Sequence, residues 1–349
     1  MWFQSDNAGP AHPSVLAAIA RANAGYAPSY GAEVGAGRAA ALVRAAFEAP
    51  EAAVFLVATG TAANALALAC LCPPWGTVFC HTHAHLQEDE CGALGFFAGG
   101  ATTTPVAGAH GRIDPDALAA AIARTGGSVH GVQPGALTLT NATEAGTLYT
   151  PDLVGELVGI AKAAGLRTHM DGARFANAVA ALGVAPGVLV EGIDVLSLGG
   201  TKNGCLGVEA VIFFDPAKGA EFERRRKRGG HLFSKHRYLS AQIEAYLADG
   251  LWLELAARAN AAARRLAAGI AAIPGALLLH PAEANAVFAT LPRARLRAAA
   301  DRGAQFYLWN PRDSFEGPDA EPIAARFVCD WSKTEAEVDA LLAVLGAPR

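Results

Sequence analysis

Two short segments of the chain each place a charged residue at the end of an apolar run. Residues 167–174 have the sequence RTHMDGAR, and residues 197–204 have the sequence SLGGTKNG. Pyridoxal phosphate needs a lysine amine for a Schiff base and a carboxylate that keeps its pyridine nitrogen protonated. Asp171 and Lys202 are the right residue types for these roles. Lysine is scarce, with six lysines against 22 arginines, so a lysine in a glycine-rich turn is an informative feature.

The surrounding sequence predicts a mostly parallel sheet covered on both faces by helices. Residues 150–165 begin with TPD, which supplies an N-cap, a first-turn proline and an acid, and they end at a glycine that can stop a helix. Apolar runs typical of buried strands occupy residues 166–170, 195–198 and 208–214. Taken singly, Asp171 could be a turn former and Lys202 a solvated turn residue. Because ligands of parallel sheets bind at the carboxyl ends of the strands, the two together favour a cofactor site.

Length and composition limit the class of protein. The chain has 349 residues, of which 52% are hydrophobic and 17% charged, as expected of a folded protein with more than one simple domain. The net charge of -4 gives no reason to expect nucleic acid as a partner. Neither a signal peptide nor an apolar run of membrane-spanning length is evident. The six scattered cysteines predict reduced packing residues in a cytoplasmic protein.

The order of helix and strand patterns along the sequence predicts three structural parts. Residues 1–25 form an N-terminal arm and helix, residues 26–235 a large domain that binds the cofactor, and residues 236–349 a small α+β domain with a bridging helix. Residues 234–269 carry apolar side chains at helical spacing, which predicts that bridging helix. Strands are expected at residues 286–291 and 325–329, and Thr334 and Glu337 form a capping box for the last helix.

Three further segments could bind ions. Residues 53–58 resemble a strand and lead through TGT into a helix, an arrangement whose free backbone N–H groups bind anions. His81, His83 and His85 alternate, so on a strand they would share one face, and a metal site is an alternative to ordinary polar roles. The basic run at residues 224–228 is either a solvated helix end or a phosphate contact across a subunit interface.

The chain resembles the low-specificity L-threonine aldolase family of fold type I PLP-dependent enzymes, in the branch whose lysine motif is similar to SLGGTKNG. The resemblance extends over almost the whole chain. It includes residues 5–7 (SDN), 30–31 (YG), 59–64 (TGTAAN), 84–86 (AHL), 142–147 (ATEAGT), 171–174 (DGAR), 197–204 and 325–328 (ARFV).

The resemblance implies a role for each matching residue. Lys202 forms the Schiff base, Asp171 pairs with the pyridinium, and His85 stacks on the ring near the substrate hydroxyl, whose proton it accepts directly or through water. The residues implied for the cofactor phosphate are Gly60, Thr61 and, through its hydroxyl, Thr201. Those implied for the substrate are Ser5, Tyr30, Arg174 and Arg326, and Arg174 is implied for the cofactor as well. For Arg326, a salt bridge at a strand edge is the structural alternative. Many relatives carry a histidine in a loop after the central strand; here the region is residues 130–135 (HGVQPG), which leaves the general base open.

The resemblance implies an aldolase that cleaves L-threonine, L-allo-threonine and related β-hydroxy-α-amino acids to glycine and an aldehyde. Its subunits are expected to share active sites in a homodimer or homotetramer. The alternatives are a phenylserine aldolase, a β-eliminating lyase or an aminotransferase of the same fold, and a catalytically idle subunit that only retains the fold.

Overall fold

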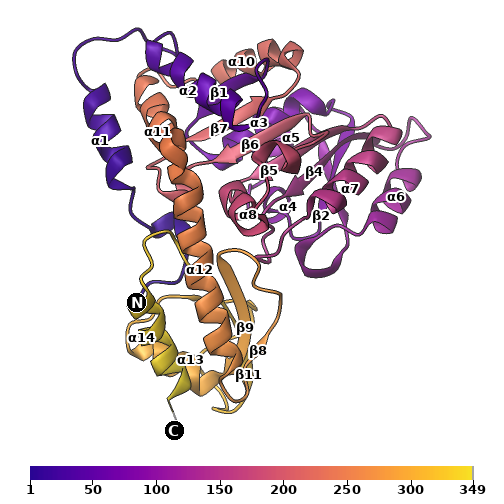
Figure 1. Cartoon of the computed structure of the whole chain (residues 1–349). Helices are drawn as coiled ribbons and strands as arrows, with labels where there is room; N and C mark the ends of the chain where they lie inside the picture. The colour runs from indigo at the N-terminus through magenta and orange to yellow at the C-terminus, as the bar shows by residue number, and fades with distance from the viewer. Residues whose placement is uncertain (348–349) are drawn as a thin grey trace.

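The computed structural model describes residues 1–347. A seven-stranded sheet with the strand order β1-β7-β6-β5-β4-β2-β3 forms the larger part of the molecule (Figure 1). Its strands are β1 (Ala53–Val57), β2 (Gly76–His81), β3 (Thr102–Val106), β4 (Gln133–Thr140), β5 (Arg167–Gly172), β6 (Val195–Gly199) and β7 (Glu209–Phe213). The five strands that are adjacent in the order β6-β5-β4-β2-β3 are parallel to one another. Strand β7 is antiparallel to both of its neighbours, β6 and β1. The predicted α/β class with a mostly parallel sheet is confirmed.

Both faces of this sheet are buried, because neighbouring residues of its strands pack into different hydrophobic clusters. On β6, Val195 packs into the cluster around α3 while Leu196 packs into the cluster that contains α7 and α8. The helices of this part are α1 (Pro13–Ala22), α2 (Val34–Ala46), α3 (Gly60–Leu71), α4 (His85–Glu88), α5 (Ala93–Phe97), α6 (Pro115–Arg124), α7 (Pro151–Ala163), α8 (Phe175–Leu182), α9 (Pro186–Leu189), α10 (Gly219–Arg228) and α11 (Arg237–Leu247). Short 3₁₀ turns are η1 (Asp6–Ala8), η2 (Ala109–Gly111), η3 (Thr201–Asn203), η4 (Pro216–Lys218) and η5 (Ala248–Gly250).

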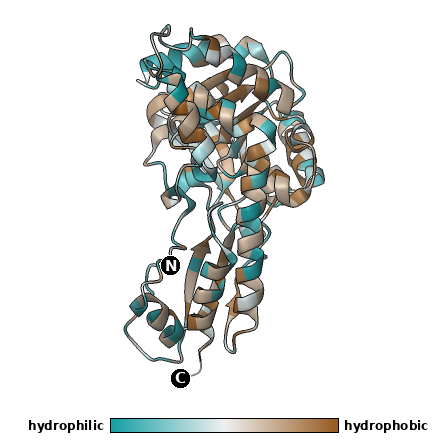
Figure 2. Ribbon diagram, turned by 60° about the vertical axis from the view of Figure 1, so that its left-hand side comes forward, coloured by the Kyte–Doolittle hydropathy of each residue, from teal (hydrophilic) through white to brown (hydrophobic). Residues whose placement is uncertain are grey.

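A four-stranded antiparallel sheet forms the smaller part, in the order β10-β11-β9-β8. Its elements are α12 (Leu251–Ala271), β8 (Leu277–Leu278), β9 (Ala286–Pro292), α13 (Arg293–Asp301), β10 (Tyr307–Leu308), β11 (Pro322–Val328) and α14 (Glu335–Gly346). Strands β9 and β11 confirm the two strands predicted there. The start of the chain joins this sheet, since Phe3 is buried in its core and the Val328 N–H donates to the Phe3 carbonyl. In Figure 2 the hydrophobic residues concentrate on the strands of both sheets.

The helix predicted for residues 234–269 is two helices. It breaks at η5, where Asp249 and Gly250 have φ of 52° and 74°. These left-handed conformations cannot continue an α-helix, and Gly is the residue that adopts them at least cost. As a result α11 packs on α1 and α2, whereas α12 runs from α8 to β9 and α14 and bridges the two sheets (Figure 1).

The predicted helix caps are present. Thr150 accepts a hydrogen bond from the Leu153 N–H at the start of α7, and the Thr334–Glu337 capping box opens α14. All six cysteines are free, and five of them are buried. No helix within residues 1–347 combines the length and the apolar character that crossing a membrane requires.

Candidate active site

A cavity of about 230 Å³ lies between the two sheets. The large sheet contributes residues that directly follow its strands: His85 after β2, Glu144 after β4, Arg174 after β5 and Lys202 after β6. The small part contributes Tyr307, Trp309 and Arg326, and the N-terminal arm contributes Ser5. The carboxyl ends of parallel strands thus meet the small sheet at one place, which is where ligands of such sheets bind.

Asp171 lies at the end of β5, 6% exposed, and does not line the cavity itself. Its Oδ2 accepts a hydrogen bond from Asn64 Nδ2 at 2.7 Å, and its Oδ1 accepts one from the Ala173 N–H at 2.9 Å. Its negative charge acts on the Lys202 amine. A buried carboxylate fixed in this way can pair with a protonated ring nitrogen.

Lys202 lies in the η3 turn. Two neighbouring polar groups of this turn, the Gly200 N–H and the Thr201 hydroxyl, are hydrogen-bonded within the protein. Glu209 on β7 accepts from the Gly200 N–H and from the Thr201 hydroxyl, so the predicted Thr201 hydroxyl is committed to Glu209 and does not line the cavity. The pKa of Lys202 is lowered by burial and then by the positive charge of Arg174. More of the amine is therefore neutral and nucleophilic at a given pH.

His85 is held by a buried glutamate that the sequence did not single out. Glu90 Oε1 accepts from His85 Nδ1 at 2.9 Å and from Asn64 Nδ2, which also donates to Asp171. The Glu90 hydrogen bond raises the pKa of His85 against the opposing effect of burial. Nε2 is left as the ring nitrogen available to a ligand. Glu90 belongs to the acidic run of residues 88–90, so the sequence shows an acidic residue near His85. It does not show that this residue contacts the His85 ring.

Arg174 is paired with Asp6 of the N-terminal arm. Its Nε and Nη2 donate to the two carboxylate oxygens at 2.7 and 2.9 Å, and Asn285 beside β9 also donates to Asp6. Burial acts to raise the pKa of Asp6, but the charges and hydrogen bonds of Arg174, together with Lys202 and Asn285, lower it overall. The arrangement fixes the Arg174 guanidinium and leaves its Nη1 for a ligand.

Arg326 on β11 has no carboxylate partner among the described residues, so the salt bridge considered for it is absent. Its Nη2 donates to the Gln4 carbonyl at 3.3 Å, and its guanidinium packs over Tyr307 and Trp309. Its Nε is buried and has no hydrogen-bond partner in the part of the chain that the structure describes. Burial and then the charge of Arg174 lower the pKa of Arg326. Two neighbouring guanidinium groups with unused N–H donors favour an anionic ligand such as a carboxylate.

The segment predicted to bind phosphate forms the start of α3. Thr59 caps the helix by accepting from the Ala62 N–H, and the first intrahelical bond is donated by Ala63. The N–H groups of Gly60 and Thr61 precede that bond, and no atom lies within 4 Å of the place where a Cβ of Gly60 would project. Free N–H groups at a helix start and room beside Gly60 fit a phosphate, although neither Gly60 nor Thr61 lines the 230 Å³ cavity itself.

Several predicted residues are not brought to the cavity. Tyr30 is 48% exposed, with Lys227 of α10 over its ring. His130 is exposed in the loop before β4, at the opposite end of that strand from Glu144. Of the basic run, Arg226 is buried and donates to the Leu56 carbonyl.

The three alternating histidines do not share a face, because β2 ends at His81. His81 Nε2 bonds to the Gly108 carbonyl, His83 Nδ1 to Glu88 and His85 Nδ1 to Glu90. No group of three or more metal-ligating side chains in residues 1–347 could hold a metal ion.

The comparisons with known proteins agree with this geometry. The family model of the beta-eliminating lyases matches residues 3–293. The low specificity L-threonine aldolase of Pseudomonas sp. (strain NCIMB 10558) is 40% identical over 347 residues, 99% of this chain and 97% of the relative. That of Pseudomonas aeruginosa is 41% identical over 331 residues, 94% of this chain and 92% of the relative.

Among solved structures, the Leishmania major threonine aldolase superposes with a TM-score of 0.90 at 28% identity, covering 99% of this chain and 98% of the other. A serine palmitoyltransferase with PLP, which matches with a TM-score of 0.75 at 17% identity over 99% of this chain and 86% of the other, shares the fold alone. The resemblance found in the sequence is confirmed: the chain belongs to the beta-eliminating lyase family, in its low-specificity L-threonine aldolase group.

Proposed function

We propose that this protein uses pyridoxal phosphate to cleave L-threonine, L-allo-threonine and related β-hydroxy-α-amino acids to glycine and an aldehyde. Two relatives about 40% identical over nearly the full chain are named low specificity L-threonine aldolases. The observation that carries the proposal is the convergence of Lys202, His85, Arg174 and Arg326 on one cavity, with Asp171 buried at the end of β5.

The residues present fit the cofactor. Lys202 would hold its aldehyde carbon, Asp171 its pyridine nitrogen and the start of α3 its phosphate, through the N–H groups of Gly60 and Thr61. When bound, pyridoxal phosphate supplies an electron sink next to the substrate's Cα. The Thr201 hydroxyl donates to Glu209, so Thr201 acts by holding the lysine turn.

The two arginines are proposed to hold the substrate carboxylate. Arg174 uses the edge that Asp6 leaves free, and Arg326 uses its unpaired Nε–H. Ser5 lines the same cavity and adds a hydroxyl. With the carboxylate at the arginines and the amine next to Lys202, we assign the wall formed by His85 to the β-carbon and its hydroxyl. Burial of these donors strengthens their interaction with an anion.

Tyr30 and the basic run at residues 224–228 lie away from this cavity within one chain. We propose that the protein is a cytoplasmic homo-oligomer, a dimer or tetramer, in which Tyr30 contributes to the site of a neighbouring subunit. Six free cysteines suit a reducing compartment. Sedimentation of the purified protein would measure the assembly, and a monomer with full activity would contradict the role of Tyr30.

Product analysis tests the proposed activity. The protein loaded with PLP and given L-threonine should release glycine and acetaldehyde in equal amounts, measured by proton NMR. Because the family also contains β-eliminating lyases, that reaction is the second candidate. Ammonia and a keto acid in place of glycine would establish elimination, and binding of PLP without any turnover would establish an idle subunit.

A further inference from the structure

Glu144 is a cavity residue to which the resemblance assigned no role. It lies on the loop of residues 141–149 that connects β4 to α7, and it lines the cavity together with His85, Arg174 and Lys202. Its Oε1 accepts a hydrogen bond from the backbone N–H of His85 at 2.7 Å. Its Oε2 is buried and has no hydrogen-bond partner among residues 1–347. A buried carboxylate oxygen without a partner is costly, and such atoms are concentrated at functional sites.

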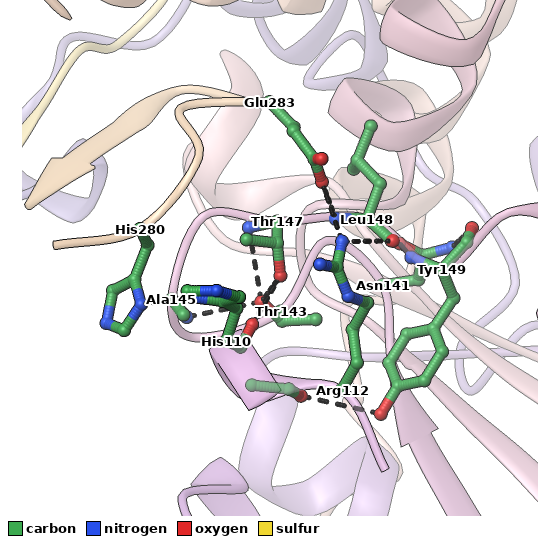
Figure 3. Close-up of polar contacts among 11 residues, drawn as sticks. His110, Arg112, Asn141, Thr143, Ala145, Thr147, Leu148, Tyr149, His280 and Glu283 are labelled. Carbon is green, nitrogen blue, oxygen red and sulfur yellow. Dashed lines mark hydrogen bonds and ion pairs between the residues drawn. The ribbon is translucent and has the colours of Figure 1, made fainter. Parts of the chain in front are cut away.

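Hydrogen bonds hold the loop that carries Glu144 in place on both sides of this residue (Figure 3). Thr143 accepts from the Thr147 N–H, and the two threonine hydroxyls bond to each other. The Thr147 hydroxyl donates to the His110 carbonyl. Glu283, which precedes β9, accepts from the Leu148 N–H and from Arg112.

These contacts fix the backbone on either side of Glu144, and the His85 N–H fixes its carboxyl group. A proton-transfer group needs this kind of positioning, because its efficiency depends on being within hydrogen-bond reach of the reacting atom.

We propose that Glu144, through Oε2, takes the proton from the β-hydroxyl of the substrate during cleavage. The inference rests on the proposed function. A substrate whose carboxylate lies at Arg174 and Arg326 directs its β-hydroxyl to the wall that His85 and Glu144 share. Oε2 accepts the hydroxyl proton, and the electrons of that O–H bond form the aldehyde C=O. The Cα–Cβ bond breaks and its electron pair stays with Cα, where a proton completes the product glycine.

The surroundings give Glu144 a proton affinity suited to this step. Burial and then the negative charge of Asp171 raise the pKa of Glu144 to about 7, while the His85 N–H and the Thr140 hydroxyl act in the lowering direction. A group with a pKa near neutrality can both accept and release a proton at working pH.

Other groups also face Glu144. Cys80 on β2 and Tyr149 have pKa values raised mainly by burial and further by the Glu144 charge, and Arg174 has its pKa raised against burial by Asp6 and, to a smaller extent, by Glu144. Glu90 raises the pKa of His85 and holds its Nδ1, so a larger share of the ring is protonated and can donate a hydrogen bond to the hydroxyl oxygen through Nε2. We therefore assign His85 the task of holding the hydroxyl rather than accepting its proton.

The test compares two reactions of the same holoenzyme, with Glu144→Gln as the variant. Glutamine can still accept the His85 N–H bond, but it cannot take a proton. Cleavage of L-threonine should fall by roughly 10²- to 10⁴-fold, the usual contribution of a general base. Exchange of the glycine α-hydrogen with deuterated water, followed by NMR, should keep the wild-type rate because glycine has no β-hydroxyl.

Unchanged cleavage, or a parallel loss of both reactions in a variant that retains cofactor, would overturn the inference. If wild-type protein exchanges glycine but forms no glycine from threonine, it is the proposed function that fails. Glu88→Gln is the matched control: Glu88 also borders the cavity but is exposed and pairs with His83, so its loss should leave both rates unchanged.

A second readout needs no turnover. In cofactor-free protein, the infrared difference spectrum between wild type and Glu144→Gln should contain a protonated carboxyl band that disappears with an apparent pKa near 7. Burial also raises the pKa of Glu209 to about 7, but Glu209 is present in both proteins and its band cancels in the difference.

Glu144→Asp, which keeps an ionisable group at shorter reach, should retain glycine exchange and recover part of the cleavage activity. A band titrating in the ordinary carboxylate range, or no recovery with aspartate in a folded variant, would count against the assignment.

Discussion

The side chains around the cavity owe their chemistry to residues that the ligand does not touch. Glu90 fixes the ring of His85, Asp6 fixes Arg174, and Glu209 fixes the turn that presents Lys202. Each is a buried carboxylate from a different part of the sequence. In each case it selects one geometry or one proton position for a residue at the cavity, as outer-sphere partners do in other enzyme sites.

Glu90→Gln should lower the pKa of His85 toward or below its ordinary value. The hydrogen bond that His85 donates to Glu90 is the largest cause of the raised pKa, and burial, which acts in the opposite direction, remains. The measurement is an NMR titration of the His85 ring in cofactor-free protein. Glu88→Gln serves as the control because Glu88 pairs with His83 instead. An unchanged His85 titration in Glu90→Gln would show that this contact does not set its protonation.

At the scale of elements, the central strands of the large sheet are connected by polar side chains as well as by backbone hydrogen bonds. His169 on β5, fully buried, bonds through Nδ1 to the Thr138 hydroxyl of β4 and through Nε2 to the Ser197 hydroxyl of β6. It lies two residues before Asp171. The neutral imidazole therefore connects three neighbouring strands, two of which lead to the proposed cofactor residues Asp171 and Lys202.

His169 predicts an acid sensitivity of the fold. Burial lowers the pKa of His169 to about 4, below its ordinary value of 6.5. A pKa that is lower in the folded state gives stability that is present above the unfolded value and is lost as pH falls through the folded one. Urea unfolding of cofactor-free protein should show this loss between those two pH values, on the order of 3 kcal/mol. The loss should be much smaller in His169→Gln. Equal pH dependence of the two proteins would rule out His169 as its source.

The elements near the cofactor were predictable because their signals are local. Short apolar runs defined β5 and β6, and the threonine caps defined the starts of α7 and α14. The break between α11 and α12 was missed, because apolar spacing continues across Asp249 and Gly250 while the backbone does not. The contacts of Asp6, Glu90 and Glu144 join residues far apart in the chain or on different elements, and no local pattern encodes them.

At the scale of the molecule, the cavity exists only because three parts of the chain meet. Asp6 comes from the arm, Arg174 from the large sheet, and Asn285 and Arg326 from the small part. Most of the residues proposed to hold the cofactor belong to the large sheet. The small part supplies one arginine of the proposed carboxylate site together with the aromatic rings on which that arginine packs.

Arg326→Lys should weaken substrate use while leaving the cofactor in place. The charge is kept but the planar set of N–H donors is lost, which should lower kcat/KM about 10- to 100-fold, or roughly 1.5–3 kcal/mol. The absorbance of bound PLP and the melting temperature should stay close to those of the wild type. Arg302→Lys, at an exposed arginine of the same part, is the control. A lower melting temperature with unchanged kcat/KM would assign Arg326 a purely structural role.

The whole account depends on Lys202 being the residue that holds the cofactor. Reduction of the PLP-loaded wild-type protein with borohydride makes a lysine–cofactor bond permanent, and peptide mass mapping then identifies the lysine. The chain has six lysines, and we predict that the label is on Lys202 and on none of the others. In Lys202→Ala, no label should appear at this position. Stoichiometric labelling of a different lysine would contradict the site described here.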